Sequence, residues 1–556
     1  RHFAAMQSLC CCIPSLRTLG HGGIVREKRK QHTVVRKSQN LRRVVTHDAF
    51  RRLDAAYDIR EVLGSGAFGE VSLVTDKISG RECVLKTINR SLVPDLDALE
   101  REVSLQSELD HPHIVRVYET ILDDARFHIC LELCQGGDLS AAIEEQGART
   151  EEQTQYLTLQ ILQAVRYIHD MEVVHRDLKL ENFLLQHQGV PLDCNIVKLI
   201  DFGFARRFGP GTPTLQTVCG SPGFMAPEII SGQDYDERCD IFSCGVIIFS
   251  MLTDRLPFDG DNWREILRNT QQMALTFTDF EKDTLSEPVR ALIMLMCRKR
   301  PSGRPDAQKV LRSAWLHDIA ISPMQSPFAA KDIMGRMRSY GSLDELAKAS
   351  LWRVAYNLTD SEVAKMREAF KSIDADGDGK ITLQELCAEA ATDDELDRLQ
   401  AVFSEIDSNH NGWLDYTEFL ATMLCRRGEL PETAIRAAFR SFDSDNSGSI
   451  SEKEVAEALS GTGVHASFER ADSNGDGQLS YEEFRDMLRS TTDLAKGSDT
   501  PLAARILIRA NTAEAPPNRV DASAWEAPAG GERPADVSGQ CPSGAATSEA
   551  AVSSAF

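Results

Sequence analysis

Four short acidic segments carry oxygen-bearing side chains at a regular spacing. The first, DADGDGKITLQE, has aspartates at its first, third and fifth positions (Asp374, Asp376 and Asp378), a glycine at the sixth and Glu385 at the twelfth. Ca²⁺ takes about six to eight hard oxygen ligands, and a loop with this spacing can wrap one ion. The aspartates would bind through their carboxylates, Lys380 through its backbone carbonyl and Glu385 through two oxygens. A single segment of this kind could equally be a chance acidic turn.

The pattern repeats in register, which excludes chance. Further copies start at Asp407, Asp443 and Asp472, each with a glycine sixth and a glutamate twelfth. Each loop also has Ile or Leu at its eighth position and a Phe four positions before its first ligand, as a helix-loop-helix unit needs for burial. The predicted ligands in these copies are Asp407, Asn409, Asn411, Trp413 and Glu418, then Asp443, Asp445, Ser447, Ser449 and Glu454, then Asp472, Asn474, Asp476, Gln478 and Glu483.

These segments resemble EF-hands arranged in two pairs, and the resemblance implies Ca²⁺ as a ligand. The loops span 374–385 and 407–418 in the first pair, and 443–454 and 472–483 in the second. The last two loops begin closest together, so we expect shortened connecting helices between them. The fourth hand is therefore expected to be the least regular.

A second set of chemically interesting residues begins at Tyr57, with YDIREVLGSGAFGEVSLV. Glycines at this spacing let backbone N–H groups approach phosphates closely. A dinucleotide-binding site would place them between a strand and a helix. The sequence after them alternates like a strand, which favours a glycine flap over ATP. The residues expected to contact the nucleotide here are Leu63, Gly64, Gly66, Gly69 and Val71.

Lys86 ends a predicted third strand, ECVLK, where its ammonium would hold the α- and β-phosphates of ATP. The predicted helix that follows, LEREVSLQSEL, carries the carboxylate that should pair with this lysine. Glu102 is the expected partner, and Glu100 is the competing carboxylate.

The remaining motifs follow in the order that phosphoryl transfer requires. VVHRDLKLENFLL supplies Asp177, Lys179 and Asn182 in one loop, and KLIDFGFA supplies Asp201. Phosphoryl transfer needs in-line positioning and charge neutralisation more than covalent chemistry. Asp177 would orient the substrate hydroxyl and accept its proton, while Lys179 would neutralise the γ-phosphate. Asn182 and Asp201 would hold Mg²⁺.

Residues 57–318 thus resemble a eukaryotic protein kinase domain, which implies a bilobal fold. The resemblance continues through GSPGFMAPE, and it makes Arg304 the expected salt-bridge partner of Glu228. Lys179, two residues after the catalytic aspartate, is typical of serine/threonine kinases. The large Phe204 after the DFG triplet favours serine over threonine as the phosphorylated residue.

The resemblance also implies contacts with nucleotide and substrate. Glu132 is the expected first hinge residue, whose backbone meets adenine beside the gatekeeper Leu131. Val84 departs from the alanine that the family usually has above the adenine. Asp138 would contact ribose and substrate, and with Glu181 it would receive basic residues upstream of the phosphorylated one. The alternative for this pair is two solvated surface carboxylates.

A kinase domain followed by four EF-hands resembles the calcium-dependent protein kinases of plants, algae and apicomplexan protists. Between the kinase and the calmodulin-like domain at 356–490, the junction 319–355 alternates apolar and basic residues. This pattern predicts a basic amphipathic helix that is bound by the EF-hand domain. In the family the segment blocks the substrate site until Ca²⁺ withdraws it. The alternative is a connecting helix packed on the large lobe of the kinase.

Three further features bear on control and location. Thr217 aligns with an activation-loop threonine, and Arg176 would pair with its phosphate; the alternative is an ordinary loop threonine. In the basic extension 1–56, three cysteines, Cys10–Cys12, could be palmitoylated and give peripheral membrane contact, or the extension is an inert leader. The segment 491–556, rich in Ala, Pro, Ser and Gly, predicts a disordered tail.

Composition supports these assignments. The chain has 556 residues, room for two or three domains, and its formal charge of −22 argues against nucleic acid as a partner. No apolar run reaches the roughly eighteen residues of a membrane-spanning helix, and no secretory signal is visible. The scattered cysteines suit a reducing cytosol, so a cytoplasmic location is expected.

The sequence therefore predicts an α+β kinase domain followed by an all-α EF-hand domain. We expect a monomeric, calcium-activated serine/threonine kinase that uses ATP, Mg²⁺ and Ca²⁺ and acts on protein substrates. The rival from another class is a calcium-sensing pseudokinase scaffold, which the presence of Lys86, Asp177 and Asp201 disfavours. Another alternative keeps the enzyme but makes Ca²⁺ merely structural.

Overall fold

The computed structural model describes residues 53–493, apart from 67–68, 94, 124, 274, 318–325, 387–392, 426–428 and 460–463. The predictions made for Cys10–Cys12 and for the tail from 494 onward lie outside these residues. Among the helices that are described, none combines the length and the apolar character needed to cross a membrane.

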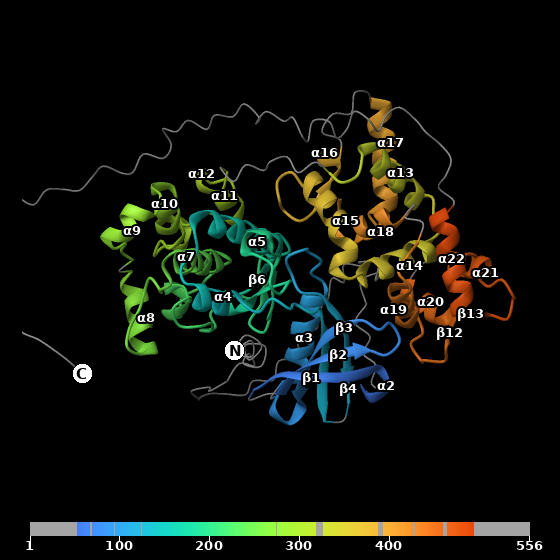
Figure 1. Cartoon of the computed structure of the whole chain (residues 1–556), viewed down its shortest axis with the longest axis horizontal. Coiled ribbons are helices and arrows are strands. Elements are labelled where there is room, and N and C mark those ends of the chain that lie inside the picture. Colours follow the sequence, from blue (N-terminus) through green and yellow to red (C-terminus); the bar gives the residue numbers. More distant parts are fainter. Residues whose placement is uncertain are drawn as a thin grey trace, which may run out of the picture. The chain divides into compact units, whose positions relative to one another are not determined.

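The small lobe of the kinase is a five-stranded antiparallel sheet in the order β1-β2-β3-β5-β4 (Figure 1). Both faces of β2 are packed, because Val71 and Val74 point to opposite sides of the sheet and belong to different buried clusters. Helix α3 begins at Asp95, whose carboxylate accepts a hydrogen bond from the amide of Ala98 and so caps the helix. The elements are α2 (Leu53–Ala56), β1 (Tyr57–Gly66), β2 (Gly69–Asp76), β3 (Glu82–Asn89), the 3₁₀ helix η2 (Arg90–Leu92), α3 (Leu96–Ser107), β4 (Val117–Leu122) and β5 (Arg126–Leu131).

The large lobe is mainly helical and is built around α5 and α7. Helix α5 begins with a capping box between Thr150 and Gln153, and α7 is buried along almost its whole length. The helices are α4 (Leu139–Gln146), α5 (Glu151–Asp170), α6 (Pro227–Ile230), α7 (Arg238–Thr253), α8 (Trp263–Gln272), α9 (Asp279–Thr284), α10 (Glu287–Met296), α11 (Ala307–Leu311) and α12 (Ala314–His317). The shorter elements are β6 (Val173–Val174), η3 (Leu180–Asn182), β7 (Phe183–Leu185), η4 (Leu192–Cys194), β8 (Val197–Leu199), β9 (Arg206–Arg207) and η5 (Pro301–Gly303).

The EF-hand region forms two pairs of helix-loop-helix units, as predicted. Two short antiparallel ribbons join the loops, β10 with β11 and β12 with β13, and they pair the eighth-position residues Ile381 with Leu414 and Ile450 with Leu479. The helices connecting the last two loops are short, as expected from the loop spacing. The elements are α15 (Asp360–Ile373), β10 (Ile381–Thr382), α16 (Leu383–Leu386), α17 (Asp393–Ile406), β11 (Trp413–Leu414), α18 (Tyr416–Leu424), α19 (Glu432–Phe442), β12 (Ser449–Ser451), α20 (Glu452–Leu459), α21 (Val464–Ala471), β13 (Gln478–Ser480) and α22 (Tyr481–Asp493).

The junction forms two helices, α13 (Ala330–Gly341) and α14 (Glu345–Tyr356), and not the single amphipathic helix that the sequence predicts. The break falls at Ser342, and Asp344 then caps α14 by accepting a hydrogen bond from Ala347 N. Helix α14 is buried on every side from Leu346 to Tyr356, because it packs against α18, α19, α20, α21 and α22. The junction is therefore part of the core of the EF-hand domain.

This core continues into the small lobe of the kinase. Apolar side chains of the sheet, including Val74 and Leu85, belong to the same buried cluster as Trp352 of α14. The hydroxyl of Tyr356 donates a hydrogen bond of 2.8 Å to the carbonyl of Val117 in β4. The EF-hand domain thus packs against the sheet through α14 and α19, and the alternative of a linker packed on the large lobe does not describe α14.

Candidate active site and calcium loops

The glycine segment lies between two strands, as the sequence predicts for an ATP flap. Gly64 pairs with Val71, and Gly66 pairs with Gly69, across the β1-β2 hairpin. A Cβ atom at Gly69 would lie 1.8 Å from the carbonyl oxygen of Thr87, so no larger residue fits without displacing β3. The hairpin can therefore carry backbone N–H groups close to a phosphate chain.

Beneath this hairpin, apolar side chains form a surface suited to a flat aromatic ring. Val71, Val84 and Leu131 are buried together with Leu184, and Leu63 packs at the edge of the same cluster. Leu184 comes from β7 of the large lobe, and the sequence analysis did not single it out. The only signal for it was the apolar pair that follows Asn182 and Phe183.

The charge of Lys86 acts on the carboxyl group of Glu102. Lys86 lies on β3 beside Val71 of β2 and Ile129 of β5. Burial raises the pKa of Glu102 to about 7, and the charge of Lys86 opposes this shift without cancelling it. The charge of Lys86 thus acts on Glu102, the partner expected from the sequence.

The catalytic loop brings its predicted residues together. Lys179 Nζ lies 3.7 Å from Asp177 Oδ2, and Asn182 Nδ2 donates a hydrogen bond of 2.7 Å to the backbone carbonyl of Asp177. Asp201 has a φ of +64°, a strained conformation that non-glycine residues adopt mainly at functional sites. Three oxygens in this loop region are buried without a protein hydrogen-bond partner: Asp177 Oδ1, Asn182 Oδ1 and Asp201 Oδ2. Hard, unpartnered oxygens of this kind fit Mg²⁺.

Asp240 of α7 fixes the backbone of the catalytic loop. Its two carboxylate oxygens accept hydrogen bonds of 2.8 Å from the amides of His175 and Arg176. Arg176 uses its guanidinium to donate to the carbonyl of Phe204 and to the hydroxyl of Tyr235. The rigid helix α7 thus supports the loop from below.

The segment around Thr217 contacts Tyr235. The hydroxyl of Tyr235 donates a hydrogen bond of 2.8 Å to the Thr217 carbonyl, and Leu215 forms a β-bridge with Tyr235. The side chain of Thr217 is exposed, while Arg176 is already engaged by Tyr235. Thr217 is thus accessible, and phosphorylation of this residue stays a prediction beside the alternative of an ordinary loop threonine.

Two other predicted residues have structural partners. Arg304 forms a buried bidentate ion pair with Glu228, with one N–O distance of 2.7 Å, which confirms that prediction. The carboxylate of Glu132 pairs with Lys198 at 2.8 Å, so only its backbone remains for the predicted adenine contact. Asp138 is only 3% exposed and caps α4 by accepting from the amide of Ala141, so it is not a solvated surface carboxylate.

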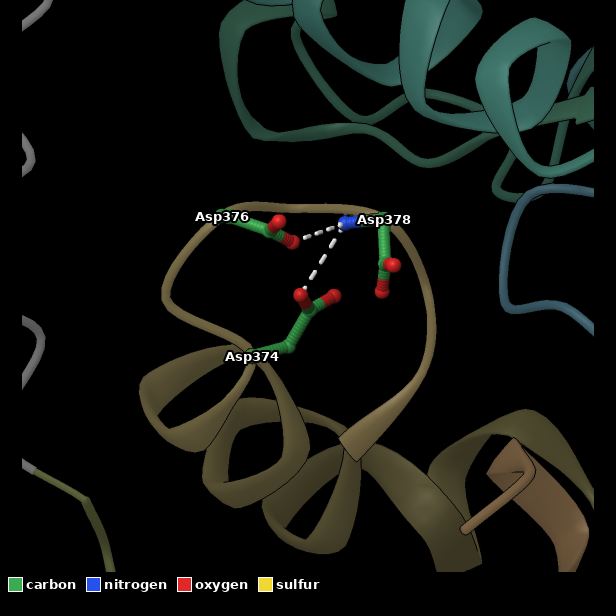
Figure 2. Close-up of side chains that lie close together, drawn as sticks. All are labelled: Asp374, Asp376 and Asp378. Atoms are coloured by element: carbon green, nitrogen blue, oxygen red, sulfur yellow. Dashed lines mark hydrogen bonds between the residues drawn. The ribbon is translucent and has the colours of Figure 1, made fainter. Parts of the chain in front are cut away.

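In the first calcium loop, the carboxylates of Asp374, Asp376 and Asp378 converge (Figure 2). They each offer an oxygen within 4.8 Å of the others. Asp374 accepts hydrogen bonds from the amides of Asp378 and Gly379, which closes the loop. Burial and then the repulsion from Asp378 raise the pKa of Asp374 well above its usual value, and burial with the Asp376 charge raises that of Asp378 to about 6. Such mutual repulsion is what a divalent cation relieves.

The third loop repeats this arrangement. Asp443, Asp445 and Glu454 offer oxygens within the same 4.8 Å. The amide of Ser447 donates to both aspartates at 2.9 Å, and Ser447 Oγ donates to the carbonyl of Ser449. The twelfth-position glutamate also accepts a hydrogen bond of 2.7 Å from the amide of Ser444, which ties the two ends of the loop together.

The second loop contains a candidate ligand that the sequence analysis missed. Asp415, at the ninth position, accepts hydrogen bonds from Asn409, Asn411 and the indole of Trp413. The ninth position often contacts Ca²⁺ through water, so an acidic residue there was the available signal. In the fourth loop, Asp472 accepts from the amides of Gly475 and Gly477, so the loop closes despite its short flanking helices.

Comparisons with known proteins agree with both halves of this description. Residues 57–316 match the protein kinase domain family, and 344–424 and 432–489 each match the EF-hand domain pair. Calcium-dependent protein kinase 5 of Plasmodium falciparum is 31% identical over 73% of this chain and 72% of its own length. Calcium-dependent protein kinase 32 of Arabidopsis thaliana is 33% identical over 76% of this chain and 78% of its own. The chain therefore belongs to the family of calcium-dependent protein kinases.

Proposed function

We propose that this serine/threonine kinase transfers the γ-phosphate of Mg-ATP to protein hydroxyls and that Ca²⁺ switches it on by moving the junction. The observation that carries the catalytic part is the trio of buried, unpartnered oxygens of Asp177, Asn182 and Asp201. Buried polar atoms are nearly always hydrogen-bonded, so a site that collects three exceptions indicates groups that come from outside the protein. A pseudokinase scaffold that binds no Mg-ATP would not need these three unpartnered oxygens.

Each side chain in this site has a role that follows from its position. Asp177 orients the substrate hydroxyl and accepts its proton, while Lys179 neutralises charge on the transferred phosphoryl group. Lys86 holds the other phosphates of ATP. Mg²⁺, held by Asn182 and Asp201, supplies positive charge beside the phosphates. Val71 and the other apolar residues beneath the hairpin exclude water from the adenine.

The substrates are proteins with basic residues upstream of the phosphorylated serine or threonine. Glu181 Oε2 is buried and has no hydrogen-bond partner among the protein groups. Asp138 is buried beside it, and its pKa is raised by burial and then by the charge of Glu181. Two carboxylates that repel each other in a buried setting would be stabilised by an arginine, which offers a planar, fork-shaped set of donors.

Calcium control acts through the junction helices. Helix α14 is enclosed by helices of both EF-hand pairs, so the calcium-loaded hands can keep the junction away from the substrate site. We propose that the junction covers that site when the loops are empty. Moving such a switch from about 1:99 to 99:1 requires roughly a 10⁴-fold preference of Ca²⁺ for one state, or ~5.5 kcal/mol. Four loops could share this at about tenfold each.

The test is the rate of phosphate transfer from labelled Mg-ATP to a serine peptide with an upstream arginine, in excess chelator and in micromolar free Ca²⁺. We expect a steep rise with Ca²⁺ and no transfer by Asp201→Asn. Equal rates in the two buffers would contradict calcium control, and transfer by Asp201→Asn would contradict the assigned metal site. A peptide with the arginine replaced by alanine should be a poorer substrate, and equal rates would contradict the basic specificity.

A further inference from the structure

The first calcium loop lies against helix α5 of the kinase large lobe, where an arginine contacts its ligand side chains. The guanidinium of Arg166 donates a hydrogen bond of 2.8 Å to the backbone carbonyl of Asp376 and one of 2.9 Å to Asp376 Oδ2. The nitrogen that bonds Asp376 Oδ2, Nη2 of Arg166, also lies 3.6 Å from Asp378 Oδ2. The side chain of Arg166 is only 8% exposed, so this cation is not a freely moving surface group.

Several other contacts place the loop in the same position. A Cβ atom at Gly377 would lie 2.9 Å from the amide nitrogen of Gln163, and one at Gly379 would lie 2.2 Å from the ring of His111. Lys380 Nζ lies 3.7 Å from Asp170 Oδ2, at the end of α5. The close approach of two glycines shows that the loop backbone itself fits this surface, so the ion pair is one part of a docked interface.

The second hand supports the same docking. Thr417, at the eleventh position of its loop, donates from both its amide and its hydroxyl to the buried carboxylate of Asp110, each at 2.8 Å. Asp110 and His111 are neighbours in the segment that follows α3. Both loops of the first EF-hand pair therefore touch the kinase at adjacent residues.

Arg166 and Ca²⁺ draw on the same two carboxylates. Asp376 and Asp378 occupy the third and fifth positions of the loop, where side-chain oxygens bind Ca²⁺ in an EF-hand. The guanidinium is attracted by the negative charge of the loop, and a bound dication would remove most of that attraction. Arg166 is largely buried whereas Asp376 is 40% exposed, so water screens this effect in part.

We infer that Arg166 is an intramolecular competitor of Ca²⁺ at the first EF-hand, so that docking of this loop on α5 lowers its calcium affinity. The coupling is reciprocal: Ca²⁺ in the first loop loosens the loop's hold on α5 by the same factor. The first hand therefore fills at a higher calcium concentration than it would when undocked. This inference rests on the calcium binding proposed above for the first loop.

The test is calorimetric titration of the full chain with Ca²⁺, which needs no kinase assay. Arg166→Gln removes the competing charge and keeps a similar shape, so the first loop should bind Ca²⁺ about five- to tenfold more tightly. Arg268→Gln, which removes an exposed arginine paired with Glu265 on α8, is the matched control and should change nothing. Glu385→Gln removes the twelfth-position ligand and identifies the signal of the first loop.

The outcomes separate the two proposals. Loss of one site in Glu385→Gln shows that the first loop binds Ca²⁺, whatever Arg166 does. Tighter binding in Arg166→Gln that disappears in the double variant with Glu385→Gln supports the competition. The competition is overturned if Arg166→Gln binds Ca²⁺ with unchanged or lower affinity. It is also overturned if Arg268→Gln tightens binding equally, or if the tightening survives in the double variant. If Arg166→Gln does not fold, Arg166→Lys replaces it, because a lysine cannot reach both the backbone carbonyl and Oδ2 of Asp376. Arg166→Lys should tighten Ca²⁺ binding by about two- to threefold, and unchanged binding overturns the inference.

Discussion

Arg440 of α19 should be the side chain whose loss most weakens the attachment of the EF-hand domain to the kinase sheet. Its guanidinium forms ion pairs with Asp76 at the end of β2 and with Glu119 in β4. Arg440 is 6% exposed, and its two partners are similarly buried. The hydroxyl of Tyr57 also donates to Glu119, so the arginine completes a buried polar network.

The size of the effect follows from what is left behind. Arg440→Gln removes the cation that pairs with both buried carboxylates and leaves Arg81 as the remaining cation that acts on Asp76. Breaking a buried ion pair in this way costs about 3–5 kcal/mol. The least costly response is separation of α19 from the sheet, which returns both carboxylates to water. At about 1.4 kcal/mol for each factor of ten, a cost of this size corresponds to about a 10²- to 4 × 10³-fold shift toward the separated form.

Hydrogen exchange of the β2 and β4 amides in the full chain measures this separation directly. Arg436→Gln is the matched control, because Arg436 lies on the same helix in an exposed pair with Glu432, and such pairs are worth only about 0–1 kcal/mol. Protection of β2 and β4 should fall in Arg440→Gln alone. Equal protection in wild type and Arg440→Gln would refute the reasoning, as would an equal loss in Arg436→Gln.

The pH dependence gives a second check on the same network. Burial acts to raise the pKa of Asp76, but the charges of Arg440 and Arg81 lower it below its usual value. The stability from this depressed pKa is present above the pKa of the unfolded chain and is lost as the pH falls through the folded value. The difference between wild type and Arg440→Gln should therefore be largest near neutral pH and shrink below about pH 4. A difference that grows with acidity would contradict this assignment.

Three further predictions concern the kinase domain. The pKa of Glu102 is raised to about 7, so the fraction of Glu102 that is charged increases as the pH rises through this value. In a pH-rate profile, the kcat of the wild type should therefore rise through about pH 7, and Glu102→Gln should lose this dependence. Gly69→Ala places a methyl group against the carbonyl of Thr87, so the KM for ATP should rise and the free energy of unfolding should fall by about 1–3 kcal/mol, as measured by nucleotide titration and urea unfolding. Glu228→Gln removes the negative charge that pairs with the buried guanidinium of Arg304, so the free energy of unfolding should fall by about 3–5 kcal/mol. An unchanged thermal midpoint of unfolding would contradict this prediction.

The local chemistry was predictable because each reaction step or ligand restricts the residue type at a fixed position. The order of Lys86, Asp177 and Asp201 follows from what a phosphate chain requires, whereas the pair of Arg304 with Glu228 was implied by the resemblance to the kinase family. The pairing of the EF-hands followed similarly from the apolar eighth positions, which must bury against each other. Asp415 was missed because the ninth position tolerates many residue types, so an acidic residue there carries little information alone.

The docking contacts could not be predicted, because an arginine that faces solvent and one that binds a distant carboxylate look alike in sequence. Arg166 lies in α5, and its partner Asp376 lies 210 positions further along the chain. Arg440 and Asp76 are 364 positions apart. Neither partner could be identified without knowing which faces of the two domains meet.

The junction shows why composition alone gave the wrong helix. Its basic residues suggested a polar face, but Lys348 and Arg353 of α14 are both buried. The guanidinium of Arg353 lies 3.5 Å above the ring of Phe442, and burial lowers its pKa to about 9. An aromatic face can accept a cation that has left water, at a cost that the surrounding apolar contacts offset. A basic residue in such a segment therefore does not identify a solvent-facing side. The sequence predicted one face of the helix bound by the EF-hand domain, whereas α14 is enclosed by helices of that domain.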